Sequence, residues 1–223
     1  MSEFHVASST PLLTSGFLDV TRELIVGPDE AEHERTIVRH PGAVCVVPML
    51  SEDTALLVRQ FRVATGGDLL EVPAGRRDVD GEPPIETARR ELAEEVGMAP
   101  AELVPLAEFW NSPGFCTEYM HCFLALSVTD TGMRTPIGAE ERAMTTADVE
   151  LDSVESLVAN RELVDAKSIV ALLLARAYLG GSHAGLPHLT PQPTRLVRLM
   201  HSSNCSWSTR TGCGSNEDSP TTR

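Results

Sequence analysis

The stretch "GRRDVDGEPPIETARRELAEEVGM", residues Gly75 to Met98, carries the signals of a helix that its own sequence bounds. Pro83 and Pro84 suit the first turn of a helix, where backbone amides have no partner within the helix, and Gly97 suits a left-handed residue beyond its end. Apolar side chains recur between them at helical spacing, at Ile85, Ala88, Leu92 and Val96. This stripe is predicted to face the core of the protein.

The same helix concentrates negative charge beside its apolar stripe. Glu94 and Glu95 follow Glu91 by three and four residues, so the three carboxylates lie on neighbouring turns and repel one another. A divalent cation such as Mg²⁺ would relieve this repulsion, because it binds carboxylate oxygens. Arg90, four residues before Glu94, can orient the carboxylates by charge-assisted hydrogen bonds. Taken alone, however, three glutamates are more typical of a solvated acidic face.

The segments around this helix predict a mixture of strands and further helices without strict alternation. Short alternating runs at residues 4–9, 16–26 and 34–40 predict strands of an exposed antiparallel sheet that is too small to fold alone. Buried strands are predicted near residues 42–50, 54–63, 68–73, 103–110, 118–128 and 145–151, and helices near 153–163 and 166–179. We therefore expect an N-terminal β-strand subdomain at residues 1–40, a main domain at 41–182, and a disordered tail at 183–223 that is rich in Gly, Ser, Thr, Asn and Pro.

Composition excludes several classes of protein. The net charge of −14 would repel nucleic acid, and no stretch approaches the 18 uninterrupted apolar residues of a membrane span. The five cysteines are odd in number and form no CxxC pair, so neither a disulfide framework nor a zinc site is indicated. The N-terminus lacks the basic start and apolar stretch of a signal peptide. We expect a cytoplasmic protein that binds neither nucleic acid nor membrane.

The loop before the helix changes the interpretation of its glutamates. Together with the helix, it resembles the sequence box of the Nudix hydrolases, at Gly75, Glu82, Arg90, Glu91, Leu92, Glu94, Glu95, Gly97 and Met98. The segments "HPGAV", "LLVRQFR", "EVPAG", "SPGF" and "EERAM" follow the order seen in the ADP-ribose pyrophosphatase branch of that family, and Pro113 stands where this branch has proline. The resemblance covers about residues 3–180. It implies an α/β fold, the Nudix α/β/α sandwich with a mixed central sheet, plus a small N-terminal antiparallel β-sheet.

Two departures from the family pattern are visible. Six residues separate Gly75 from Glu82, where the family usually has five, but an insertion in a loop is cheap and leaves the helix register intact. Cys116 and Thr117 precede Glu118, where relatives often have serine and aspartate, which affects the expected substrate contacts of this loop.

The resemblance implies a role for each matching residue. Metal binding falls to the glutamates of the helix and to one backbone carbonyl, namely Glu91, Glu95, the nearby Glu94 and the carbonyl of Ala74. Two or three Mg²⁺ or Mn²⁺ ions per site are expected. Substrate binding falls to Arg62, with Arg59 and Gln60 as neighbours, and to Glu71, Pro113, Gly114 and Glu118, the last at the terminal ribose. Glu141 or Glu140 would orient or deprotonate the attacking water, with Glu141 preferred, and Glu82 would brace Arg90, which belongs with Glu94 to the catalytic group. Gly75, Glu82 and Gly97 are structural positions of the box.

These roles imply metal-dependent hydrolysis of the diphosphate bond of ADP-ribose to AMP and ribose 5-phosphate. Metal ions would neutralise the phosphoryl oxygens and lower the pKa of a water. Two alternatives stay open: a Nudix hydrolase of another sugar nucleotide, such as GDP-mannose, or of an oxidised nucleotide, and a non-catalytic Nudix module that binds a ligand. The partner expected in every enzymatic case is a nucleoside diphosphate derivative. We also expect a homodimer, because the N-terminal strands form a small sheet with open edges.

Overall fold

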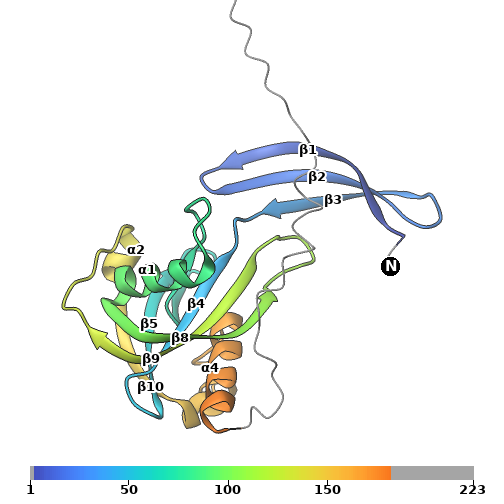
Figure 1. Ribbon diagram of the computed structural model, residues 1–223. Coiled ribbons are helices and arrows are strands. Elements are labelled where there is room, and N and C mark those ends of the chain that lie inside the picture. The colour runs from blue at the N-terminus through green and yellow to red at the C-terminus, as the bar shows by residue number, and fades with distance from the viewer. Residues whose placement is uncertain (1–2, 182–223) are drawn as a thin grey trace, which may run out of the picture. The chain divides into compact units, whose positions relative to one another are not determined.

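The computed structural model describes residues 3–181, so the predicted tail at 183–223 lies outside the described part (Figure 1). Seven strands form the centre of the fold, in two sheets of the order β10-β5-β6 and β7-β4-β9-β8. Their bounds are β4 Ala43–Pro48, β5 Thr54–Arg62, β6 Gly67–Glu71, β7 Ala74–Arg76, β8 Met98–Trp110, β9 Tyr119–Asp130 and β10 Thr145–Glu150. The pair β4 and β9 is parallel and the other pairs are antiparallel, so the four-stranded sheet is mixed.

Helices cover the four-stranded sheet on both faces. Side chains alternate along β4, so that Val44 and Val46 belong to the apolar cluster under α1 (Pro84–Val96), whereas Cys45 and Val47 belong to the cluster under α4 (Ala166–Leu179). Short helices complete the fold, namely α2 (Ala139–Ala143), η1 (Leu151–Ser153) and α3 (Val154–Ala159). The architecture is the α/β sandwich with a mixed sheet that the sequence predicted.

The N-terminal strands form a separate antiparallel sheet in the order β1-β2-β3, as predicted (Figure 1). The strands are β1 (His5–Ser15), β2 (Leu18–Val26) and β3 (Glu32–Arg39). Every residue of β1 is exposed to solvent. Glu23 in β2 is nevertheless buried, where it accepts hydrogen bonds from Ser9, Thr21 and Arg39.

Helix α1 forms as its sequence predicts. Pro83 is the N-cap, and Gly97 ends the helix in the left-handed conformation at φ 71°, which L side chains rarely adopt. Ala88 and Leu92 are completely buried against the sheet. The helix end is tied to the loop after β9, because Thr131 donates two hydrogen bonds to the carbonyl of Gly97. The acidic side of α1 is thereby fixed with respect to the sheet.

Within residues 3–181, no helix combines the length and the apolar character that crossing a membrane would require.

Candidate active site

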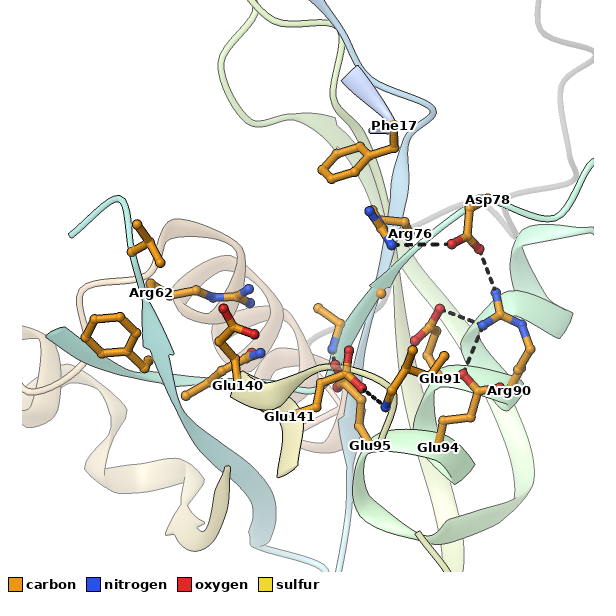
Figure 2. Close-up of a pocket in the computed structure, with 16 residues that line it drawn as sticks. Phe17, Arg62, Arg76, Asp78, Arg90, Glu91, Glu94, Glu95, Glu140 and Glu141 are labelled. Carbon is orange, nitrogen blue, oxygen red and sulfur yellow. Dashed lines mark hydrogen bonds and ion pairs between the residues drawn. The ribbon is translucent and has the colours of Figure 1, made fainter. Parts of the chain in front are cut away.

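A cavity of about 420 Å³ lies where the acidic side of α1 faces β5 and the α2 segment (Figure 2). Ten residues that the sequence singled out line it: Gln60, Arg62, Ala74, Gly75, Arg90, Glu91, Glu94, Glu95, Glu140 and Glu141. They come from four elements, namely β5, β7, α1 and α2. The fold therefore gathers most of the predicted site into one cavity.

The remaining predicted residues lie outside the lining of this cavity. Arg59 is exposed on β5, and Gly97 marks the end of α1. Glu118, on the loop of Pro113 and Gly114, accepts a hydrogen bond from the Asn111 side chain and lies 3.9 Å from Nε2 of His40. The two other residues, Glu71 and Glu82, form ion pairs with residues that line the cavity: Glu71 with Arg62, and Glu82 with Arg90.

Arg90 is the organising cation of the acidic side. Its Nε and Nη2 donate to the two carboxylate oxygens of Glu82, at 3.2 and 3.1 Å. Its Nη1 donates to Glu91 at 2.8 Å and to Glu94 at 3.2 Å. The hydrogen bond to Glu82, with the charges of Glu91 and Glu82, holds the pKa of Arg90 above its usual range. One guanidinium thus holds three carboxylates in fixed directions.

Burial perturbs the two innermost carboxyls of α1. The Glu95 side chain is buried and accepts a hydrogen bond from the Ala74 amide at 3.0 Å. Burial, with the nearby charges of Glu91 and Glu141, raises the pKa of Glu95 to about 8. Burial also raises the pKa of Glu91 to about 7, although Arg90 opposes this shift. Carboxylates that are buried together in this way gain from a cation that replaces their protons.

The donor set of the cavity fits a hard divalent cation. It consists of carboxylate oxygens and the backbone of Ala74, without cysteine or histidine, which is the chemistry that Mg²⁺ and Mn²⁺ prefer. A Cβ atom at Gly75 would lie only 1.9 Å from Cδ of Glu91, so the glycine leaves the room that this carboxylate occupies. In the described part of the chain, no three His, Cys, Asp or Glu side chains already converge as a metal-binding group. The carboxylates of α1 instead accept hydrogen bonds from Arg90, in the case of Glu91 and Glu94, and from the Ala74 amide, in the case of Glu95.

The α2 segment supplies two further carboxylates from the opposite wall. Glu141 accepts hydrogen bonds from the backbone amides of Ile137 at 2.7 Å and Gly138 at 3.4 Å, which fix its side chain. Its charge contributes to the raised pKa of Glu95, so the two carboxyls lie near each other. In Figure 2, Glu141 lies beside Glu95, whereas Glu140 points into the cavity on the side of Arg62. The two candidates for activating water therefore differ in position: Glu141 is near the carboxylates of α1, and Glu140 is near Arg62.

Arg62 faces this acidic wall from β5. Its Nε and Nη2 donate to the two carboxylate oxygens of Glu71, each at 2.7 Å, and its side chain is 38% exposed toward the cavity. The fork-to-fork geometry fixes the guanidinium plane. A cation held in this way opposite a set of carboxylates can bind the anionic part of a substrate that a metal ion also contacts.

Six residues that line the cavity were not singled out from the sequence, namely Phe17, Phe61, Val63, Arg76, Asp78 and Ile137. Phe17 is in the turn between β1 and β2, and the Cζ atom of Arg76 lies 4.1 Å from the centroid of its ring (Figure 2). Arg76 and Arg90 both approach Asp78, each at 3.6 Å. The exposed aromatic residue next to a tight turn was the available signal for Phe17, but only the fold brings it to α1.

Comparison with known proteins agrees with this geometry. The model of the NUDIX domain family matches residues 39–173, and the chain belongs to this family. The chain is 35% identical over 155 residues to an ADP-ribose pyrophosphatase of Bacillus subtilis (strain 168), a match that covers 70% of this chain and 83% of the relative. It is 33% identical to an ADP-ribose pyrophosphatase of Mycobacterium tuberculosis (strain ATCC 25618 / H37Rv), over 80% of this chain and 86% of the relative.

More distant comparisons widen the range of relatives. The chain is 30% identical to a GDP-mannose pyrophosphatase of Citrobacter koseri (strain ATCC BAA-895 / CDC 4225-83 / SGSC4696), over 69% of this chain and 82% of the relative. A crystal structure of an ADP compounds hydrolase superposes with a TM-score of 0.71 at 23% identity, covering 82% of this chain and 97% of that one. This structural likeness supports the fold.

Proposed function

We propose that this protein hydrolyses the diphosphate bond of ADP-ribose to AMP and ribose 5-phosphate with the help of Mg²⁺ or Mn²⁺. The observation that carries the proposal is one cavity in which the carboxylates of the partly buried Glu91 and the buried Glu95 face the guanidinium of Arg62. A metal ion and an arginine on opposite sides suit a substrate with two adjacent phosphates. The names of the relatives from Bacillus subtilis and Mycobacterium tuberculosis support the choice of ADP-ribose.

The residues of the cavity would divide the work as follows. Glu91, Glu95, the nearby Glu94 and the carbonyl of Ala74 hold two or three divalent ions. When bound, these ions neutralise phosphoryl oxygens and lower the pKa of a water. Arg62 binds the diphosphate and stabilises the charge that develops on it, and Gln60 is its neighbour in the lining. Glu141 accepts the proton of the water that attacks phosphorus, because its carboxylate is fixed near Glu95.

The nucleobase end of the substrate would lie at Phe17. The phenyl ring is 45% exposed, borders the cavity and is flanked by the guanidinium of Arg76. An exposed aromatic face offers stacking to a base, and such stacking contributes about 1–3 kcal/mol per base. The apolar side chains Phe61, Val63 and Ile137 border the same cavity.

GDP-mannose is the second candidate substrate, because relatives that are 30–31% identical carry the name GDP-mannose pyrophosphatase. The same cation site and the same Arg62 would serve either diphosphate, so the discrimination rests on the base and the terminal sugar. The test is turnover of a panel of nucleoside diphosphate derivatives with Mg²⁺, with product identification by mass spectrometry. AMP and ribose 5-phosphate from ADP-ribose are expected, and turnover of another sugar nucleotide at least about tenfold better would refute this specificity.

We also propose a cytoplasmic homodimer. All eleven residues of β1 are exposed, including the apolar Val6, Leu12 and Leu13, and β1 is an open edge of its sheet. Pairing with a second copy would bury the exposed apolar side chains and would satisfy the open edge of the sheet. Cys45, Cys116 and Cys122 are free thiols, which suits a reducing compartment.

A further inference from the structure

A row of alternating charges lies behind Arg62 on the side away from the cavity. Glu71 is almost fully buried, with a side chain that is 1% exposed, and it accepts hydrogen bonds from Arg62 and from Nζ of Lys167. Lys167 itself is 11% exposed and donates a second hydrogen bond to Asp165 at 2.9 Å. Along this row, starting at the cavity, the charges are therefore positive, negative, positive and negative.

Lys167 occupies an unfavourable place for a cation. It is the second residue of α4, whose N-cap is Asp165, and the positive end of a helix dipole disfavours a nearby ammonium group. Lysine is also rarely buried unless it is paired. The stability of α4 alone does not account for a lysine whose side chain is only 11% exposed at this position, whereas its ion pair with Glu71 does.

The first turn of α4 forms two hydrogen bonds with the end of β6. Lys167 holds the side chain of Glu71, and Oγ of Ser168 accepts a hydrogen bond from the backbone amide of the next residue, Val72, at 2.9 Å. Ser168 is fixed in turn, because its own amide donates to the N-cap Asp165 at 3.0 Å. Glu71 is thus held by both its side chain and the adjoining backbone, from residues that are 96 apart in the sequence.

The ion pair with Glu71 leaves the Nη1 group of Arg62 available. Arg62 uses Nε and Nη2 on Glu71, and among residues 3–181 its Nη1 group makes no hydrogen bond. Burial alone would raise the pKa of Glu71, but the bonds and charges of Arg62 and Lys167 outweigh burial and lower it. Glu71 therefore stays ionised as the fixed anchor of Arg62, with its negative charge shared between two cations.

We propose that Lys167 is a positioning residue for substrate binding: through Glu71 it holds the Arg62 guanidinium in the orientation that receives the diphosphate. The inference rests on the proposed function only in taking Arg62 as the diphosphate ligand. Without Lys167, Glu71 would lose one donor and its charge would be balanced by Arg62 alone. Arg62 would then be less fixed and would offer less net positive charge to an anionic substrate.

Steady-state kinetics on Lys167→Met, with Lys167→Arg as the matched control, test this role. Methionine keeps an unbranched side chain, one atom shorter than that of lysine, but removes the charge and the donors, whereas arginine keeps both. We expect Lys167→Met to raise KM about fivefold to tenfold with kcat within about twofold, because Arg62 is still present and its weaker hold on the diphosphate affects the bound substrate and the transition state alike. Lys167→Arg should keep most of the affinity. Unchanged KM in a folded Lys167→Met protein would overturn the proposal.

A double-variant cycle tests whether Lys167 acts through Arg62. In an Arg62→Met background, Lys167→Met should add less than about twofold to KM, because the residue that it positions is gone. A full, multiplicative effect in that background would show that Lys167 acts on substrate by another route and would refute the proposal. KM is measured with the diphosphate that the wild-type enzyme turns over best, so that a substrate other than ADP-ribose refutes the proposed function without affecting this cycle.

A readout without substrate completes the test. The Nε–H signal of Arg62 in ¹⁵N NMR spectra, assigned by its loss in Arg62→Met, should exchange slowly with solvent in the wild type and at least about tenfold faster in Lys167→Met. Equal exchange rates would refute the proposal even if no hydrolysis is detected. If Lys167→Met does not fold, the double variant Glu71→Gln/Lys167→Met, in which the buried carboxylate and its lysine are neutralised together, replaces it. The same rise in KM and faster exchange are expected, and their absence refutes the role.

Discussion

The carboxylate of Glu91 lies against the backbone of Gly75, so closely that a Cβ atom on the glycine would fall 1.9 Å from Cδ of the glutamate. Gly75 is in β7 and pairs with Val44 of β4, whereas Glu91 is in α1. The contact therefore joins the acidic side of the helix to the edge of the sheet. The first glycine of the Nudix box is required here by space, since its φ angle is not in the left-handed region.

Gly75→Ala should displace the Glu91 carboxylate and leave the fold in place, because the clashing atoms are the far end of a flexible side chain. We expect catalytic activity to fall by about 10²-fold, while the free energy of unfolding changes by less than about 1 kcal/mol. Gly67→Ala is the matched control, since a Cβ atom there meets nothing within 4 Å. Kinetics and denaturant unfolding of both variants measure the two effects. Full activity in Gly75→Ala would contradict the proposed place of Glu91 in the site.

Glu95→Gln and Glu141→Gln should separate metal binding from activation of water. Glu95 is buried at the cavity floor next to Ala74, so its loss should weaken metal affinity by more than about tenfold. Glu141 lies on the opposite wall, and its loss should leave metal affinity nearly unchanged while kcat falls by about 10²–10⁴-fold. Titration calorimetry with Mn²⁺ and kinetics at saturating metal make the comparison, with the exposed Glu86→Gln on the same helix as a control. Equal loss of metal affinity in both variants would refute this division.

Mg²⁺ should stabilise the folded protein, and EDTA should reverse the effect. A ligand that binds only the folded state at about 100 times its Kd adds about 2.7 kcal/mol to the free energy of unfolding. The binding also relieves the repulsion among carboxylates whose pKa burial has raised. Differential scanning fluorimetry with and without Mg²⁺ gives the shift in Tm. The shift should disappear in Glu95→Gln, and an undiminished shift there would place the ion elsewhere on the protein.

How far the sequence predicted the structure depends on how local each signal is. Helix α1 follows from signals within its own 13 residues and their flanks, and both its bounds and its buried stripe are confirmed. The main strands are confirmed as well, because continuous apolar runs suffice to identify them. Two elements were missed: β7 has three residues and forms only because β4 pairs with it, and α2 has five residues and no buried side chain.

The site shows the same dependence on distance along the chain. The carboxylates of the box were predicted together because they share one helix. Phe17 was missed since its place at the cavity depends on how the turn between β1 and β2 lies against β7. Lys167 was missed because its partner Glu71 is 96 residues away and no local pattern marks either residue as half of an ion pair. Conversely, Glu118 follows the family order, yet the structure places it outside the lining of the cavity.

The N-terminal sheet should lose stability in acid through Glu23. Burial alone would raise the pKa of Glu23, but hydrogen bonds from Thr21, Arg39 and Ser9 lower it overall. A carboxyl with a lowered pKa stabilises the folded state above its unfolded value, near 4.5, and this contribution is lost as the pH falls through the folded value. Hydrogen exchange of residues 18–26, followed by mass spectrometry from pH 6 down to about pH 3, should show protection that falls in the wild type. Glu23→Gln should begin less protected and depend less on pH, and parallel profiles would contradict the role of Glu23.

The final prediction concerns how two copies share their sites. We expect a homodimer formed through the N-terminal sheet, with a mass by light scattering of twice the 24.1 kDa of one chain. Because Phe17 lines the cavity of its own chain, each protomer should carry a complete site.

Mixing Phe17→Ala and Glu95→Gln chains tests this directly. In a mixed dimer with separate sites, each cavity retains one defect, so activity should not exceed the mean of the two variants. If strands exchanged between protomers, one cavity would receive both defects and the other none. Recovery to about half of wild-type activity in the mixed dimers would therefore show that Phe17 serves the partner's cavity, and a monomer that is fully active at nanomolar concentration would exclude any need for the second copy.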